Sequence, residues 1–307
     1  MSMKYCFGID IGGTTVKMGL FNANGQLLDK WEIKTRTEYG GEAILPDIVE
    51  MIFHKQKEHG ISREKIIGIG VGVPGAVCGE GIVESTTNLG WGYKNVKEEL
   101  KKLSGHRVIV ENDANVAALG EMWKGAGIGH KNLVMVTLGT GVGGGIITNG
   151  QLVTGVKGGA GEIGEIIIDY ETTENGEKIS RNLEYYVSAT GLVRMAKKKL
   201  TDHERETRLM IENVTAKAIF DAVKMGDEVA IEIAEKFGCY LGQTLLNLAV
   251  TLEPEMFVIG GGVSKTGDIL LEVVKKYYRN ANSKLALATL GNDAGIYGAA
   301  KMALRRV

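Results

Sequence analysis

Two glycine-rich turns in this 307-residue chain have the residue types of phosphate-binding loops. The first reads Asp10-Ile-Gly-Gly-Thr-Thr15 and the second Leu138-Gly-Thr-Gly-Val-Gly-Gly-Gly145, each after an apolar run typical of a strand. Glycine adopts positive φ and leaves backbone N–H groups open to an anion, so such turns suit phosphate. A third glycine run, Ile259-Gly-Gly-Gly-Val263, follows another apolar segment. Three such loops predict a nucleotide held from several sides.

The candidate nucleotide-binding residues come from the three turns and the strand after the first. They are Asp10, Gly12, Gly13, Thr14, Thr15, Lys17, Thr137, Gly139, Thr140, Gly141, Gly260, Gly261 and Gly262. A carboxylate beside a triphosphate would be repelled unless a divalent cation lay between them, so Asp10 is predicted to bind Mg²⁺ through water. The alternative interpretation is that Asp10 only caps N–H groups of the turn.

A carboxylate that could accept a proton lies in the segment Glu111-Asn-Asp-Ala-Asn115. Asp113 precedes an alanine-rich stretch typical of a helix, and the N-terminus of a helix favours an ionised carboxylate. An ordinary N-cap would explain this position equally well. In a chain that binds nucleotide phosphates, however, an aspartate that faces a hydroxyl group is the expected proton acceptor for phosphoryl transfer. Asp113 is therefore the candidate catalytic base.

Two other nucleotide-binding motifs are disfavoured. The segments 70–75 and 139–144 both match G-x-G-x-x-G, but that fingerprint requires a helix directly after it. Another extended run follows residue 144, and a loop follows residue 75. A GxxxxGK[ST] P-loop is absent from the sequence.

The elements that must position these residues form a repeated pattern of strands and helices. Extended runs are expected at 4–10, 15–21, 27–35, 66–73, 108–110, 133–136 and 256–259. Helices are expected around 44–52 and at 114–124, 190–200, 215–225, 229–253, 266–280 and 294–307. The strand–turn–strand pattern of the first residues restarts at Asn132, and this repetition predicts an α/β fold with two related halves.

Length and composition restrict the architecture and the partners. A chain of 307 residues exceeds one hydrophobic core, so two domains with a cleft between them are expected, at 1–115 and 116–293, with the helix 294–307 packed back on the first. A net charge of −1 disfavours a nucleic acid partner. The apolar runs are too short to span a membrane, and three isolated cysteines suit a reducing compartment, so a cytoplasmic protein is expected.

The combined motifs resemble the ROK family of sugar kinases, within the sugar kinase, Hsp70 and actin superfamily, over essentially the whole chain. The matching segments are 10–15, 72–75, 88–91, 111–115, 138–141, 158–164 and 259–262. The resemblance implies two actin-like (ribonuclease H-like) α/β domains around an interdomain cleft. It also implies ATP-dependent phosphorylation of a hexose, most often glucose at its 6-hydroxyl group, by a homodimer.

The same resemblance implies a set of sugar-binding residues. They are Gly75, Asn88, Asn112, Asp113, Glu162, Glu165 and Glu184. The segment that contains Asn88 has an alternative interpretation as a structural turn anchored by Trp91.

The chain departs from the family at its structural zinc site. Most members have a histidine and three cysteines where this chain has Glu165, Asn175, Glu177 and Asn182. Oxygen ligands are poor substitutes for thiolates, so no structural zinc is expected, and packing and hydrogen bonds must hold the loop 169–182.

The replacement also places a third carboxylate near the predicted sugar. The carboxylates of Glu162, Glu165 and Glu184 would crowd together, which raises at least one pKa or favours an amino sugar that carries an ammonium group. Alternatively, Glu165 points away and pairs with Arg181 or Lys178.

Other functions stay open at this point. The runner-up substrates are fructose, mannose, allose, glucosamine and N-acetylated hexosamines. Some members of the family are repressors with an N-terminal DNA-binding segment, but only four residues precede the strand at Tyr5. A sugar sensor without catalysis is disfavoured by the intact Asp113.

Overall fold

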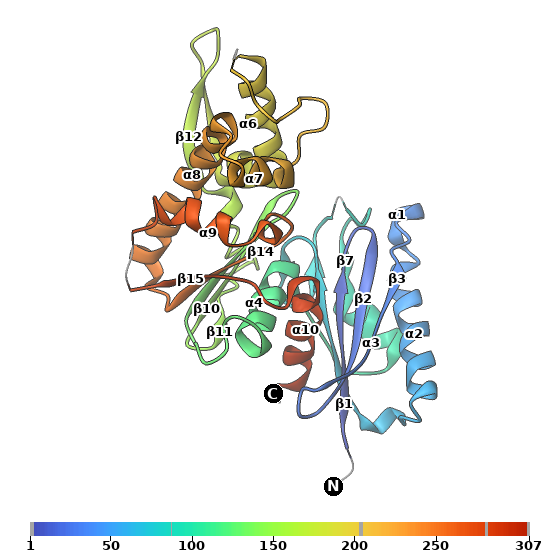
Figure 1. The fold of residues 1–307 in the computed structure, drawn as a ribbon. Helices are drawn as coiled ribbons and strands as arrows, with labels where there is room; N and C mark the ends of the chain where they lie inside the picture. The colour runs from blue at the N-terminus through green and yellow to red at the C-terminus, as the bar shows by residue number, and fades with distance from the viewer. Residues whose placement is uncertain (1–2, 87, 203–204, 280–281, 306–307) are drawn as a thin grey trace.

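The computed structural model describes residues 3–86, 88–202, 205–279 and 282–305 (Figure 1). Two five-stranded sheets have the same topology. The first has the order β3-β2-β1-β4-β8, with β1 (Tyr5–Ile11), β2 (Thr15–Asn22), β3 (Leu27–Lys34), β4 (Ile66–Val73) and β8 (Val108–Asn112). The second has the order β11-β10-β9-β14-β15, with β9 (Leu133–Leu138), β10 (Val142–Thr148), β11 (Gln151–Leu152), β14 (Met256–Gly260) and β15 (Lys284–Leu287).

In both sheets, one strand pairs antiparallel with the strand that follows it and parallel with a later one. β1 pairs with β2 and β4 in this way, and β9 pairs with β10 and β14. The α/β fold predicted from the sequence is confirmed. The strand β15 was not expected, because its four residues carry too short a pattern to stand out in the sequence.

The parallel strands are covered on both faces, which explains their composition. β4 consists only of valine, isoleucine and glycine and is almost fully buried, as expected for a strand between two layers of helices. On one side, α2 (Ile44–Glu58) and α3 (Val96–Ser104) cover the first sheet (Figure 1). The buried residues Ile44, Ile48 and Ile52 follow the helical spacing of α2.

On the other side, the helix α10 (Ala294–Leu304) lies against β1, β4 and α4 (Asp113–Lys124). The approach is close, because a Cβ atom at Gly8 or Gly70 would lie 2.1 Å from Ile296 O or 1.8 Å from Ala299 O. α4 also packs against β9 and β10 of the second sheet. The expected domain boundary at residue 115 thus falls inside a helix that contacts both sheets.

Helices also cover the second sheet around a large apolar core. They are α5 (Leu183–Val187), α6 (Ala189–Thr201), α7 (Ala216–Lys224), α8 (Glu228–Leu252) and α9 (Asp268–Lys275). α9 is shorter than the predicted helix 266–280. It begins later because residues 263–266 form a separate turn of 3₁₀ helix, and it ends at Lys275. Residue 280 lies outside the described residues. No helix in the described part of the chain is long and apolar enough to cross a membrane.

Short elements complete the chain. They are α1 (Glu38–Gly41), β5 (Val77–Cys78), β6 (Ile82–Val83), β7 (Lys94–Asn95) and the 3₁₀ turns Arg63–Lys65, Ile163–Glu165, Val263–Thr266 and Gly291–Asp293.

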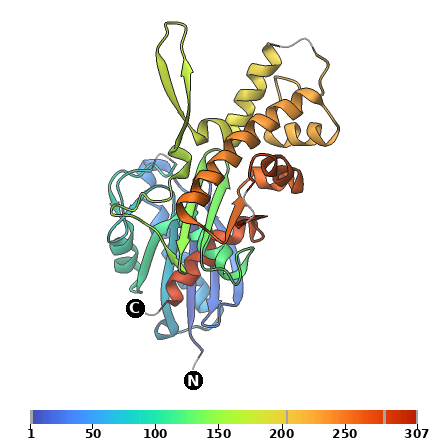
Figure 2. The same ribbon diagram turned by 90° about the vertical axis from the view of Figure 1, so that its left-hand side faces the viewer.

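The segment expected as a loop at 169–182 is largely an antiparallel hairpin of β12 (Ile167–Thr172) and β13 (Lys178–Asn182). Figure 2 shows it projecting from the body of the protein. The guanidinium group of Arg181 pairs with Glu171 across the two strands, with Nη2 2.7 Å from Oε2. At its base, Asp169 accepts hydrogen bonds from the hydroxyl groups of Tyr186 and Tyr240. An ion pair and hydrogen bonds therefore hold this hairpin.

Candidate active site

A cavity of about 370 Å³ opens where the carboxyl ends of β4, β8, β9 and β14 meet. Ligand sites in open α/β sheets favour this edge. The structure brings together eleven of the residues predicted from the sequence. They are Gly75, Asn88, Asn112, Asp113, Thr137, Gly139, Thr140, Gly141, Glu162, Glu184 and Gly261.

Asp113 is the first residue of α4 and faces this cavity. Its Oδ1 accepts hydrogen bonds from the backbone N–H of Ala114 at 2.8 Å and from Nδ2 of Asn112 at 3.1 Å. Burial raises the pKa of Asp113, and these hydrogen bonds oppose that shift. The carboxylate is thus desolvated but held in one orientation, as a general base requires.

Asn112 positions its neighbour as well as the helix. Its Oδ1 accepts from the N–H groups of Ala114 and Asn115, which makes it the N-cap of α4. Its Nδ2 donates to the carbonyl oxygen of Gly75 at 3.1 Å. The amide of Asn112 therefore connects the ends of β4 and β8 beside Asp113.

Asp10 lies at the carboxyl end of β1 and is half-buried. Burial, followed by the negative charge of Asp113, raises its pKa to about 6, and the charge of Lys17 opposes this shift. Lys17 is the residue opposite Asp10 on β2. A Cβ atom at Gly295, the second residue of α10, would lie 2.5 Å from the Asp10 carboxylate, so the return helix closes over this group.

The first glycine turn is a tight hairpin, in which Gly12 donates to the carbonyl oxygen of Thr15 at 3.0 Å. A Cβ atom at Gly13 would lie 3.3 Å from Asn88, so this turn adjoins the cavity without lining it. Nine predicted residues do not line the cavity in this structure. They are Asp10, Gly12, Gly13, Thr14, Thr15, Lys17, Glu165, Gly260 and Gly262.

The second and third glycine turns pack directly against each other. Gly261 has a φ of 84°, and a Cβ atom there would lie 2.5 Å from Leu138 O. The second turn is closed by the bond from Gly139 N to Gly141 O at 2.9 Å. The hydroxyl group of Thr190 donates to the carbonyl oxygen of Thr140. These contacts form one wall of exposed backbone, suited to an anion.

Two further carboxylates, those of Glu162 and Glu184, line the same cavity as Asp113. Glu184 Oε2 accepts the backbone N–H of Val142 at 2.8 Å. Burial raises the pKa of Glu162, with further contributions from the charges of Asp113, Glu165 and Glu184. The crowding of carboxylates expected from the sequence is therefore present.

Glu165 lies outside the cavity, and the alternative prediction that it pairs with Arg181 or Lys178 was wrong. Glu165 Oε2 accepts from Nδ2 of Asn182 at 3.0 Å, whereas Arg181 pairs with Glu171. The pairing of the two strands explains this outcome. Arg181 on β13 lies opposite Asp169 on β12, and Glu171 is two residues further along β12.

Sequence reasoning missed the supporting role of Glu111 and Asn115. Glu111 Oε1 accepts from Asn112 N at 2.9 Å and from Nδ2 of Asn115 at 3.1 Å. Burial raises the pKa of Glu111. The Oδ1 atom of the buried Asn115 has no hydrogen-bond partner among the described residues. The spacing of four residues at a helix start was the signal available for this contact.

Comparison with known proteins agrees with this geometry. The model of the ROK family matches residues 6–306, and the chain belongs to this family. It is 42% identical to a glucokinase of Halalkalibacterium halodurans, over 97% of this chain and 94% of that protein. It is 33% identical to a glucokinase of Thermotoga maritima, over 98% of this chain and 97% of that protein.

A solved structure has the same fold. The ROK family glucokinase from Streptomyces griseus, in complex with glucose and AMPPNP, superimposes with a TM-score of 0.77 at 30% identity. The comparison covers 97% of this chain and 98% of that one. The actin-like fold that the resemblance implies is therefore confirmed.

Proposed function

We propose that this protein is an ATP-dependent hexose kinase that converts glucose to glucose 6-phosphate. The observation that supports it is the position of Asp113, in one cavity with a wall of carboxylates and amides and a wall of glycine backbone. The similarity to glucokinases over nearly the whole chain supports the same substrate.

In the proposed reaction, the oxygen of the sugar 6-hydroxyl group bonds to the γ-phosphorus of ATP, and Asp113 accepts the proton of that hydroxyl group. The bond between that phosphorus and the oxygen bridging to ADP breaks. Because the transition state is loose, the proton leaves late, and a carboxylate is a sufficient base. Asn112 holds the acceptor oxygen of Asp113 in place.

The sugar and the nucleotide are assigned to opposite walls. Gly75, Asn88, Asn112, Glu162 and Glu184 bind the sugar hydroxyl groups, with Glu165 just outside. The turns at 137–141 and 260–262 hold the phosphates through backbone N–H groups, together with the turn at 12–15 and Lys17.

Asp10 fits a Mg²⁺ site, because its carboxylate lies close enough to that of Asp113 for the two negative charges to interact. When bound, Mg²⁺ neutralises the charge of the phosphates. Asp10 would hold it through water. We also propose that the protein binds no structural zinc.

The amino sugar glucosamine is a second candidate substrate. The charges of Glu165 and Glu184 help to raise the pKa of Glu162, which shows that negative charge is crowded there. A sugar that carries a positive charge would relieve this repulsion. Other hexoses are the remaining alternatives.

Release of ADP, measured by a coupled assay over a panel of hexoses, tests the function directly. We expect the highest kcat/KM with glucose, and a kcat about 10²- to 10⁴-fold lower in the variant Asp113→Asn. Turnover of glucosamine equal to or below that of glucose at every pH removes the reason for the second candidate. If no sugar accelerates ADP release, the proposal is wrong.

We further propose a cytoplasmic homodimer without nucleic acid or membrane partners. Its domains would be residues 1–115, together with the helix 294–307, and residues 116–293. Sedimentation at several protein concentrations tests the dimer.

A further inference from the structure

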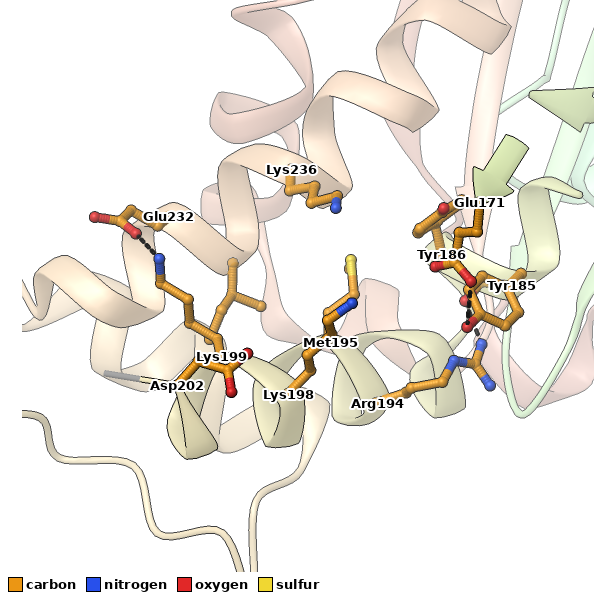
Figure 3. A pocket seen from close by; sticks show the side chains of 11 residues that line it. Glu171, Tyr185, Tyr186, Arg194, Met195, Lys198, Lys199, Asp202, Glu232 and Lys236 are labelled. Carbon is orange, nitrogen blue, oxygen red and sulfur yellow. Dashed lines mark hydrogen bonds and ion pairs between the residues drawn. The ribbon is translucent and has the colours of Figure 1, made fainter. Parts of the chain in front are cut away.

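A second cavity, of about 320 Å³, lies on the far side of α5 from the candidate active site. Its walls come from α5, α6, α8 and β12 (Figure 3). This volume is within the range of sites that bind small molecules. It has no part in the proposed phosphoryl transfer, since Asp113 and the glycine turns line the other cavity.

One part of the cavity is apolar and aromatic. The ring of Tyr186 lies on that of Tyr240, with the centroids 4.1 Å apart and the planes 20° apart. The side chains of Met195 and Ile233 add aliphatic surface. Figure 3 shows Met195 pointing toward the middle, with Tyr185 and Tyr186 on one side. Such a surface suits a planar, apolar group.

The same cavity carries cations that form no close ion pair with a described residue. The ammonium group of Lys236 lies 5.6 Å from the centroid of Tyr186 and 5.9 Å from that of Tyr240. Its charge helps to lower the pKa of Asp169, but the two groups make no ion pair within the described part of the chain. Lys198 makes neither a hydrogen bond nor an ion pair with any described residue. Arg194 lies over the ring of Tyr185 at 3.7 Å and donates to its carbonyl oxygen, so its charge is not compensated there.

Most of the acids at this cavity are already neutralised. Glu232 pairs with Lys199 at 2.6 Å and with Arg205 at 2.7 Å. Glu171 pairs with Arg181. Among the described lining residues, Asp202 is the one further acid outside these pairs, against the three cations above. The cavity therefore has excess positive charge beside an apolar surface.

We propose that this cavity binds a small organic anion with a planar, apolar body, and that its occupation changes sugar binding. The planar group lies against Tyr186 and Met195, and the anionic group lies between Lys236 and Lys198. An anion gains from both the ammonium groups and the low polarity around them.

The link to the active site is the short helix α5. Glu184 accepts the N–H of Val142 at the sugar cavity, and the next residue, Tyr185, lines the second cavity. A Cβ atom at Gly141 would lie 2.5 Å from Glu184 Oε2, so there is little room for this carboxylate to move independently. A ligand that shifts Tyr185 therefore shifts Glu184. This half of the proposal rests on the proposed role of Glu184 in sugar binding.

Titration with 1-naphthyl phosphate tests the site, with glucose and a nonhydrolysable ATP analogue kept saturating so that the active site is blocked. We expect saturable binding with one site per chain, and weaker binding of 1-naphthol or inorganic phosphate alone. Lys236→Met should weaken binding at least about tenfold, the effect of losing a charged contact. Met195→Glu, which adds a carboxylate in the middle of the cavity, should abolish it.

Lys197→Met is the control, because Lys197 is exposed on α6, the helix that carries Met195 and Lys198, but does not line the cavity. It should leave the dissociation constant within about twofold. Equal affinity in the Lys236→Met and Lys197→Met variants, or binding of 1-naphthol as tight as that of its phosphate, overturns the site.

The coupling has its own measurement. The dissociation constant of glucose should change more than about twofold with 1-naphthyl phosphate in the unmodified protein, and not in Lys236→Met. An unchanged constant in the unmodified protein overturns the coupling alone. A failure of the proposed kinase function appears separately, as absent ADP release, and does not alter the binding of 1-naphthyl phosphate.

Discussion

The carboxylates of Asp10 and Asp113 lie at the carboxyl ends of two parallel strands of one sheet, and the charge of Asp113 adds to the effect of burial on Asp10. Two anions next to one cavity are unfavourable in the protein without a ligand. The Mg²⁺ ion that we propose at Asp10 would offset this repulsion. This relationship makes the effects of pH and substitution at Asp10 predictable.

Asp10→Asn should stabilise the protein at neutral pH. Burial raises the pKa of Asp10 in the folded state from its ordinary value of 3.8 to about 6. The protonated Asp10 carboxyl group therefore makes its full contribution to stability below about pH 4, and this contribution is lost as the pH rises through 6. At pH 7.5 the ionised group costs on the order of 3 kcal/mol, and the variant should recover part of this.

Urea denaturation of both proteins at pH 7.5 and pH 4.5 measures this effect. The variant should gain free energy of unfolding at pH 7.5 and little at pH 4.5, while kcat falls. A gain that is the same at both pH values contradicts the assigned pKa.

Asp113→Asn should lower kcat about 10²- to 10⁴-fold, which is the usual contribution of a general base. The amide has a similar shape, so the dissociation constant of glucose should change only a few-fold. Steady-state kinetics and calorimetric titration measure the two quantities. The control is Glu165→Gln, at an exposed residue outside the cavity, which should keep kcat within about threefold. A comparable loss of kcat in both variants argues against Asp113 as the base.

The activity should be lost on the acid side at a higher pH than for an ordinary aspartate. Asp113 must be ionised to accept the proton, and burial raises its pKa. The value of kcat/KM should therefore fall as the pH decreases through this raised pKa. A pH–rate profile from pH 4.5 to 8 measures it, with a check that the protein stays folded. A flat profile down to pH 4.5 is the contrary outcome.

Gly261→Ala should weaken nucleotide binding. The added Cβ atom would lie 2.5 Å from Leu138 O at a φ of 84°, which forces the two glycine turns apart. We expect the KM for ATP to rise about tenfold or more and the dissociation constant of glucose to stay nearly constant. Gly92→Ala is the control, because Gly92 does not line the cavity, its φ is not positive and nothing lies within 4 Å of the added atom. Equal effects of the two substitutions would contradict the packing argument.

Glu121→Ala should destabilise the connection between α4 and the segment before α10. The fully buried carboxylate accepts the backbone N–H groups of Ala126 and Leu290, each at 2.8 Å, and of Thr289 at 3.1 Å. Without an acceptor these groups remain buried and unpaired, at a cost of about 3 kcal/mol or more. Urea denaturation measures the loss, and Glu121→Gln should show a smaller one. No change in the alanine variant would mean that water replaces the carboxylate.

The sequence alone determined the parts of this protein that depend on local spacing. The glycine turns, the apolar runs of β1, β4, β9 and β14, and the helix that starts at Asp113 each follow from neighbouring residues. Because the strand–turn–strand pattern occurs twice, the α/β fold and the family could also be predicted. The approximate position of the cavity could be predicted as well, because the carboxyl ends of parallel strands meet at one edge of a sheet.

Only the tertiary structure decided how residues far apart in the sequence meet. Gly261 packs against Leu138, Glu121 reaches Leu290, and Glu165 faces Asn182 rather than Arg181. The two sides of α5 could not be assigned either, because five residues of helix show no clear periodicity. Glu184 meets the β10 backbone while Tyr185 lines the second cavity beside α6 and α8, and a local pattern carries no information about such distant neighbours.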